Sequence, residues 1–245
     1  MTYKAERIVP YELNDAPKSV QIERMFDEIA GQYDCLNHVL SMGIDKYWRR
    51  KGILSLKAFA PRTVLDVATG TGDLALDAYR LLRPEKITGI DISGKMMAIG
   101  KEKVAKAGLS EVINFEWQNC TCLQLDSETF DAAIVAFGIR NFEDLDKGLK
   151  EIYRILNQGG QLMILELSSP EQFPMKQGYR LYSNLIPKIG QWISRSNTAY
   201  RYLPKSISAF PQNEAMVAIL EKAGFSNVSF KKLTGGICSM YRAGK

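Results

Sequence analysis

Between residues 61 and 168, short apolar runs alternate with segments of helical periodicity. The apolar runs predict strands over 63–67, 86–91, 112–117, 130–136 and 161–167. The segments between them predict helices over 74–82, 94–107 and 143–156. Asn157-Gln158-Gly159-Gly160 predicts a helix stop and a tight turn before the fifth strand. Alternating strands and helices are typical of a parallel sheet with crossover helices, so residues 61–168 are expected to form an α/β core.

The two ends of the chain follow other patterns. Residues 1–60 predict a helical N-terminal segment, because 20–30 and 47–59 have helical apolar spacing, whereas 33–43 is polar and irregular. Residues 212–245 predict a helix over 212–223 and strands near 226–233 and 237–242. The Gly235-Gly236 pair between those strands predicts a hairpin, so the last strand should run antiparallel to its neighbour. We therefore expect a single domain with seven strands, mostly parallel.

Composition narrows the classes of protein. A length of 245 residues with 46% hydrophobic residues suits one domain with an ample core, and no apolar run approaches the roughly 18 residues of a membrane span. Residues 1–12 lack the apolar stretch of a signal peptide, so a cytoplasmic protein is expected. The four cysteines and single histidine show no metal-ligand spacing, and we expect no metal. A net charge of +5, spread along the chain, is too small to indicate nucleic acid but suits an anionic membrane surface.

The segment Leu65-Asp66-Val67-Ala68-Thr69-Gly70-Thr71-Gly72-Asp73 carries the strongest chemical signal. Its glycines let a ligand lie against bare main chain at a helix N-terminus. The next predicted strand ends in Asp91, where a ribose would present two hydroxyls. Gly70-x-Gly72-x-x-Ala75 formally satisfies the dinucleotide fingerprint. However, Asp66 and Asp73 would repel a pyrophosphate and suit the ammonium and sulfonium of S-adenosylmethionine.

This segment resembles the first motif of the Rossmann-like class I methyltransferases, which also have a reversed last strand. Longer stretches resemble the quinone C-methyltransferases, which methylate a ring carbon of demethylmenaquinone or of a ubiquinone precursor. These stretches are Phe26 to Gly43, Phe137-Gly138-Ile139-Arg140-Asn141-Phe142, Tyr200 to Pro211 and Lys222 to Phe225. Two positions depart from the family: His38 stands where an acid is common, and Asp45 where a histidine is common. We therefore do not assign His38 as the catalytic base.

The resemblance implies which residues contact four parts of S-adenosylmethionine. They are Asp66 for the ammonium, Gly70, Thr71 and Gly72 for the methionine end, Asp91 for the ribose, and Asn119 and Cys120 for the adenine. Without the resemblance, Asn119 is equally well explained as a turn residue. Three catalytic roles are expected: Arg140 stabilises a phenolate, Asn141 fixes a water that removes the ring proton, and Tyr33 closes over the acceptor. In the alternative, Arg140 pairs with Glu143 or Asp144 and only caps a helix.

Residues 169–211 break the alternation of strands and helices and are expected to form a helical cap over a polyprenyl quinol. The apolar residues of this cap are Tyr179, Leu181, Tyr182, Leu185, Ile186, Ile189, Trp192 and Ile193, with Lys176, Arg180, Lys188 and Arg195 around them. An isoprenoid tail needs such an apolar path, and the basic residues suit peripheral contact with anionic headgroups. A core-packing helix pair explains the same residues equally well. Another small aromatic acceptor, a nucleic-acid substrate and a non-enzymatic binding role remain alternatives, and the oligomeric state stays open.

Overall fold

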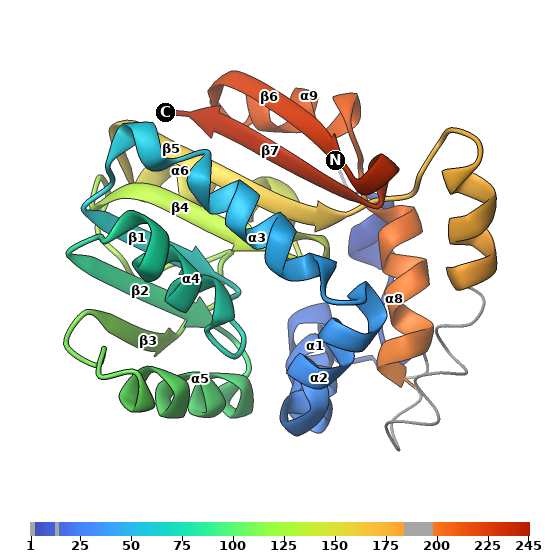
Figure 1. The fold of residues 1–245 in the computed structure, drawn as a ribbon, viewed down its shortest axis with the longest axis horizontal. Helices are drawn as coiled ribbons and strands as arrows, with labels where there is room; N and C mark the ends of the chain where they lie inside the picture. The colour runs from blue at the N-terminus through green and yellow to red at the C-terminus, as the bar shows by residue number, and fades with distance from the viewer. Residues whose placement is uncertain (1–2, 13–14, 184–197) are drawn as a thin grey trace.

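The computed structural model describes residues 3–12, 15–183 and 198–245. Its centre is a seven-stranded sheet in the order β3-β2-β1-β4-β5-β7-β6 (Figure 1). The strands are β1 (Thr63–Val67), β2 (Lys86–Asp91), β3 (Ile113–Trp117), β4 (Phe130–Ala136), β5 (Leu156–Leu167), β6 (Ser226–Leu233) and β7 (Cys238–Gly244). Strands β1 to β5 pair in parallel, whereas β7 pairs antiparallel with both β5 and β6. The predicted mostly parallel sheet with a reversed last strand is confirmed.

Helices cover both faces of the sheet and its carboxyl edge (Figure 1). They are α1 (Lys18–Ile29), α2 (Tyr33–Ser41), α3 (Ile44–Leu54), α4 (Asp73–Leu82), α5 (Gly94–Lys106), α6 (Leu145–Ile155), α8 (Thr198–Ala209) and α9 (Glu214–Lys222). Residues 175–183 are helical as well. The cap residues Leu185, Ile186, Pro187, Lys188, Ile189, Trp192, Ile193 and Arg195 lie outside the described residues. None of the helices in the described ranges is long and apolar enough to cross a membrane.

Alternation along the central strands builds two hydrophobic cores, because successive side chains point to opposite faces. On β1, Leu65 packs with α6 and α9, while Val64 packs with α3, α4 and α5. Both side chains are fully buried, as expected for a parallel strand covered by helices on either side. The carboxyl ends of these strands are therefore left to line a site.

Helices α1, α2 and α8 form a layer, here called the roof, beyond the carboxyl ends of the strands (Figure 1). Ile22, Met25 and Ile29 of α1 pack with Ala199 and Tyr202 of α8 in a third cluster. Two segments far apart in the sequence thus enclose one space above the sheet.

Two details of the prediction are wrong. Residues 33–43 are not irregular: Tyr33–Ser41 forms α2, because Leu36 is buried against Tyr200 of α8 and gives the helix an apolar anchor. Likewise, Gly159-Gly160 makes no turn before β5 but lies inside it. The pairing with β4 slips there, between Phe130↔Leu156 and Ala132↔Gln161, so the glycines form an irregularity within the strand. The Gly235-Gly236 hairpin between β6 and β7 is confirmed.

Candidate active site

The glycine loop between β1 and α4 is held against the end of β2. The Gly70 amide donates to Asp91 Oδ2 at 2.8 Å, and the Ser93 amide donates to Asp91 Oδ1 at 2.8 Å. Gly72 has φ +77°, and a Cβ there would lie 2.8 Å from the Phe115 ring, so this position requires glycine. Burial raises the pKa of the Asp91 carboxyl. Each anchored oxygen of Asp91 keeps a second lone pair for a ligand hydroxyl.

Asp66 is a buried carboxylate with spare hydrogen-bonding capacity. It is 0% exposed, and its Oδ2 accepts a hydrogen bond from Thr69 Oγ1 at 2.7 Å. Its Oδ1 has no hydrogen-bond partner among the described residues. Burial raises the pKa of Asp66 to about 7. A buried carboxylate oxygen without a partner is costly, and the ammonium predicted at Asp66 would satisfy it.

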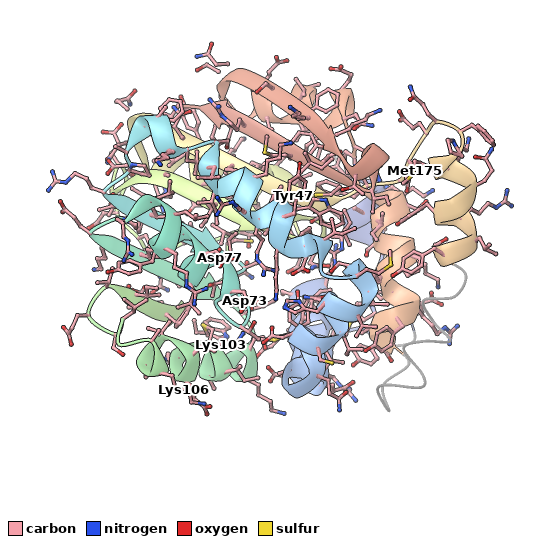
Figure 2. All side chains as sticks on the ribbon, in the orientation of Figure 1. Tyr47, Asp73, Asp77, Lys103, Lys106 and Met175 are labelled. Atoms are coloured by element: carbon pink, nitrogen blue, oxygen red, sulfur yellow. The ribbon has the colours of Figure 1, made fainter. Side chains whose placement is uncertain are left out.

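Two other residues of the loop are already occupied. The Thr71 hydroxyl donates to Asp34 Oδ1 at 2.6 Å. Of the two donors predicted for Thr71, the backbone amide is therefore the one left for a ligand. Asp73 accepts a hydrogen bond from Lys103 Nζ at 2.7 Å, and Arg49 Nη2 lies 3.6 Å from its second oxygen (Figure 2). Asp73 is therefore ion-paired, although Lys103 also pairs with Asp34, and Asp66 is the loop carboxylate without a cation beside it.

Asn119 and Cys120 follow β3 at the same edge of the sheet. Asn119 Oδ1 accepts hydrogen bonds from the Thr121 amide at 3.0 Å and the Thr121 hydroxyl at 2.9 Å. The side chain thus shapes a turn, as its alternative explanation required, and leaves its amide nitrogen for a ligand. Burial raises the pKa of the Cys120 thiol, which therefore packs and is not poised to react.

Three cavities surround these groups, and we name each by its chemistry. The Asp66 cavity spans about 460 Å³ of empty space, open solvent included, beside the glycine loop, and the Asp91 cavity about 710 Å³ beside Asn119 and Cys120. The apolar cavity spans about 1030 Å³ of such space under α1, α2 and α8. It is lined by Met25, Phe26, Ile29, Tyr33, Leu36, Asn37, Leu40, Ser41, Asp45, Trp48, Arg49, Phe137, Arg140, Leu167, Tyr179, Tyr182, Ala199, Tyr200, Tyr202, Leu203, Ile207 and Ile237.

Tyr33 and Phe137 line all three cavities, and no other described residue does so. Phe137 has φ +59°, which is unusual for an aromatic residue, and its amide donates to Leu165 O at 2.8 Å. Burial raises the pKa of the Tyr33 hydroxyl. The three cavities therefore meet beside these two rings, and the role of Tyr33 over the acceptor stays a prediction.

Arg140 lies inside the apolar cavity and is 6% exposed. Its Nη1 donates to Glu166 Oε1 at 2.8 Å and to Phe137 O, while the Arg140 amide donates to Glu166 Oε2 at 3.2 Å. The alternative in which Arg140 pairs with Glu143 or Asp144 is therefore wrong, since its partner is on β5. Its Nε is buried without a partner among the described residues and leaves one donor for a ligand.

The loop that carries Arg140 is fixed by residues that the sequence argument missed. Lys18 Nζ, which is buried, donates to Arg140 O and Phe142 O at 3.2 Å each. Asn141 lines the Asp91 cavity, and its Oδ1 accepts a hydrogen bond from Tyr202 OH at 3.0 Å. The signal for Glu166 was an acid within an otherwise apolar strand, whereas Lys18 gave none.

The two departures from the family pattern meet in space. His38 Nδ1 of α2 lies 3.3 Å from Asp45 Oδ2 of α3. Asp45 also accepts hydrogen bonds from Arg49 Nη1 at 2.6 Å and Ser41 Oγ at 2.7 Å. The two positions that depart from the family pattern are therefore in contact in this chain. Within the described ranges, no cluster of three or more His, Cys, Asp or Glu could hold a metal ion.

The strand order and the polar strand ends around a glycine loop define a class I S-adenosylmethionine-dependent methyltransferase. A methyltransferase of Aquifex aeolicus shares the fold, with a TM-score of 0.55 and 21% identity over 75% of this chain and 81% of that one. The phosphoethanolamine N-methyltransferase 2 of Haemonchus contortus, solved with S-adenosyl-L-methionine, has a TM-score of 0.58 and 17% identity over 80% of this chain and 52% of that one.

Sequence comparison defines the family. The model of the ubiE/COQ5 methyltransferase family matches residues 14–245, and the chain belongs to that family. A Bacteroides fragilis protein named demethylmenaquinone methyltransferase is 55% identical over the full length of both chains. A Porphyromonas gingivalis protein of the same name is 47% identical over 96% of this chain and 97% of its own. A Geotalea daltonii protein, named ubiquinone/menaquinone biosynthesis C-methyltransferase, is 43% identical over 93% and 97%.

The raised pKa of Asp66 predicts an unusual pH dependence of stability. Unfolding returns this carboxyl from a pKa of about 7 toward 3.8, so the folded state binds the extra proton between those values. Burial of the carboxylate therefore costs nothing below about pH 4, and the cost grows until about pH 7. Asp66→Asn should raise the unfolding free energy of the ligand-free protein by up to about 4 kcal/mol at pH 8, with no gain at pH 4. Urea unfolding across this range tests it, and a gain that does not vary with pH would contradict it.

Proposed function

We propose that this chain transfers a methyl group from S-adenosylmethionine to a ring carbon of demethylmenaquinol. The observation that carries the proposal is the meeting of the apolar cavity with the Asp66 and Asp91 cavities beside Tyr33 and Phe137. The names of the B. fragilis and P. gingivalis relatives support demethylmenaquinol as the acceptor.

The Asp66 cavity and the Asp91 cavity suit the two ends of the methyl donor. In this proposal, Asp66 Oδ1 accepts from the ammonium, and the backbone of Gly70, Thr71 and Gly72 lies along the methionine end. Asp91 accepts the ribose hydroxyls, and Asn119 and Cys120 lie against the adenine. The bound donor supplies an electrophilic methyl group, already activated by the sulfonium charge. The residues then have to orient the acceptor and exclude water.

The apolar cavity suits the ring and first isoprene units of a polyprenyl quinol. Its walls are mostly aliphatic and aromatic. Arg140 is a buried cation in these walls, and Tyr33 and Tyr202 lie close to it. The Arg140 Nε donor would favour the phenolate form of the quinol, which is the stronger carbon nucleophile. Near the cavity, Met42 and Leu181 are 78% and 68% exposed and provide apolar surface for peripheral contact with a membrane.

Methyl transfer from labelled S-adenosylmethionine tests the proposed function. The purified chain should methylate reduced demethylmenaquinol with a short prenyl tail, but not the oxidised quinone, which lacks the electron-rich ring. The same assay with a ubiquinone precursor and with a panel of simple phenols tests the alternative small acceptors. Lys46, Arg50, Arg80 and Lys106 line an open groove, a clustering that the sequence did not reveal. Retention on RNA at moderate salt, with no transfer to any quinol, would favour a nucleic-acid substrate instead.

Asp91 should control affinity for the methyl donor. Asp91→Ala removes two charge-assisted hydrogen bonds and should weaken S-adenosylmethionine binding by about 2–4 kcal/mol, whereas Asp91→Asn should be milder. Titration calorimetry measures both, and thermal unfolding of the ligand-free variants shows whether the loop anchored by the Gly70 amide has been lost. Unchanged affinity in folded Asp91→Ala would refute the ribose assignment.

Arg140 should act on the rate and hardly on donor affinity. Loss of its charge should lower the rate by roughly two to three decades, and Arg140→Lys should recover part of it. Because Arg140→Ala leaves Glu166 buried and unpaired, a loss of stability is expected as well. The double variant Arg140→Gln/Glu166→Gln removes both charges and separates the two effects.

The pH series gives the decisive readout for Arg140. If Arg140 stabilises the phenolate, the rate loss in its variants should shrink as the pH rises, because bulk base then ionises the quinol. A rate loss of equal size at every pH would show instead that Arg140 only holds the loop in place.

A further inference from the structure

A carboxylate–imidazole pair connects the apolar cavity with solvent. Asp45 lines the apolar cavity and its side chain is 5% exposed. His38 lines the Asp66 cavity and the open groove between α3, α4 and α5, and its side chain is 36% exposed. With 3.3 Å between His38 Nδ1 and Asp45 Oδ2, the pair leads from a buried wall to the outside.

The proposed reaction needs such a connection. When a ring carbon accepts a methyl group, it still carries its hydrogen, which must leave as a proton before the ring is aromatic again. Among the described residues, Asp45 is the one carboxylate that lines the apolar cavity. Glu166 does not line this cavity and pairs with Arg140, and Asn141 lines the Asp91 cavity.

We propose that Asp45 accepts the ring proton, directly or through one water, and that His38 passes it to solvent. This inference rests on the proposed function. The ring uses one π electron pair to bond the methyl carbon while the C–S bonding pair stays on the sulfur of the departing thioether, and the C–H pair then returns to the ring as the proton moves to Asp45. His38 Nδ1 takes this proton while Nε2 releases another to water in the groove. A weak base is enough, because regaining aromaticity drives the loss of the proton.

The surroundings of the pair hold it ready for this transfer. Ser41 Oγ donates to Asp45 Oδ1, and Arg49 Nη1 donates to Asp45 Oδ2, which fix the carboxylate in one orientation. Arg49 is held in turn by Asp77 Oδ2, 3.0 Å from its Nε. His38 Nδ1 is shielded from solvent and lies 3.3 Å from Asp45 Oδ2 without a hydrogen bond, so a rotation of the imidazole ring has to align the two atoms before the proton moves.

An isotope experiment separates proton transfer from a structural role. The probe is demethylmenaquinol with a short prenyl tail, carrying hydrogen or deuterium on the ring carbon that accepts the methyl group. The unmodified enzyme should show no primary isotope effect, because proton loss follows the slower methyl transfer. Asp45→Asn should lower the rate roughly 100-fold or more and show a normal primary isotope effect, because proton loss becomes the slow step.

Asp77→Asn is the matched control, because it also removes a carboxylate from Arg49 but lines neither the apolar nor the Asp66 cavity. It should show no primary isotope effect. A slow Asp45→Asn enzyme without a primary isotope effect would overturn the proposal. If the unmodified enzyme binds S-adenosylmethionine yet never methylates the probe, the proposed function itself has failed.

Exchanging the two residues tests His38. The variants His38→Asp and Asp45→His each put two like groups together, whereas the double variant restores a carboxylate–imidazole pair in reverse order. The double variant should recover activity that both single variants lose, with no primary isotope effect. A double variant slower than either single variant would refute a shared role in proton transfer.

Discussion

The geometry of the site depends on burying one ion pair, Arg140 with Glu166, at the carboxyl edge of the sheet. A buried pair repays more of its desolvation as further hydrogen bonds satisfy its polar atoms, and Arg140 Nε still lacks a partner among the described residues. Here Glu166 also accepts hydrogen bonds from the Arg140 and Leu167 amides, so the loop after β4 is tied to the end of β5. Lys18 holds the carbonyl side of the same loop. These contacts fix Phe137 in its left-handed conformation at the junction of the cavities.

The parts of this fold that could be predicted are those with a local cause. The strands follow from apolar runs and the glycine loop from its own residues. Contacts between distant residues could not be predicted: Glu166 is 26 positions from Arg140, and Lys103 is 30 positions from the Asp73 with which it pairs. Helix α2 was missed for the same reason, since its buried Leu36 packs on Tyr200. Gly159 and Gly160 misled because a glycine pair serves a bulge as well as a turn.

The candidate site shows the same division. The positions of Asp66 and Asp91 follow from the strands that end at them, whereas Asn119 and Cys120 depended on the family resemblance. From the sequence, His38 and Asp45 stood out as two separate departures from the family pattern. They form one contact only because residues 33–41 are helical and face the start of α3. A change at one position thus has its explanation at the other.

The origin of the cavity walls divides the protein into two parts that natural selection can alter separately. Only Phe137, Arg140, Leu167 and Ile237 reach the apolar cavity from the sheet and its loops. Every other described wall residue comes from the N-terminal helices, from residues 175–183 or from α8, whereas the glycine loop and the strand ends supply most of the Asp66 and Asp91 cavities. Mutations in the helices that line the apolar cavity can therefore change which acceptor fits there. The residues that line the Asp66 and Asp91 cavities need not change with them.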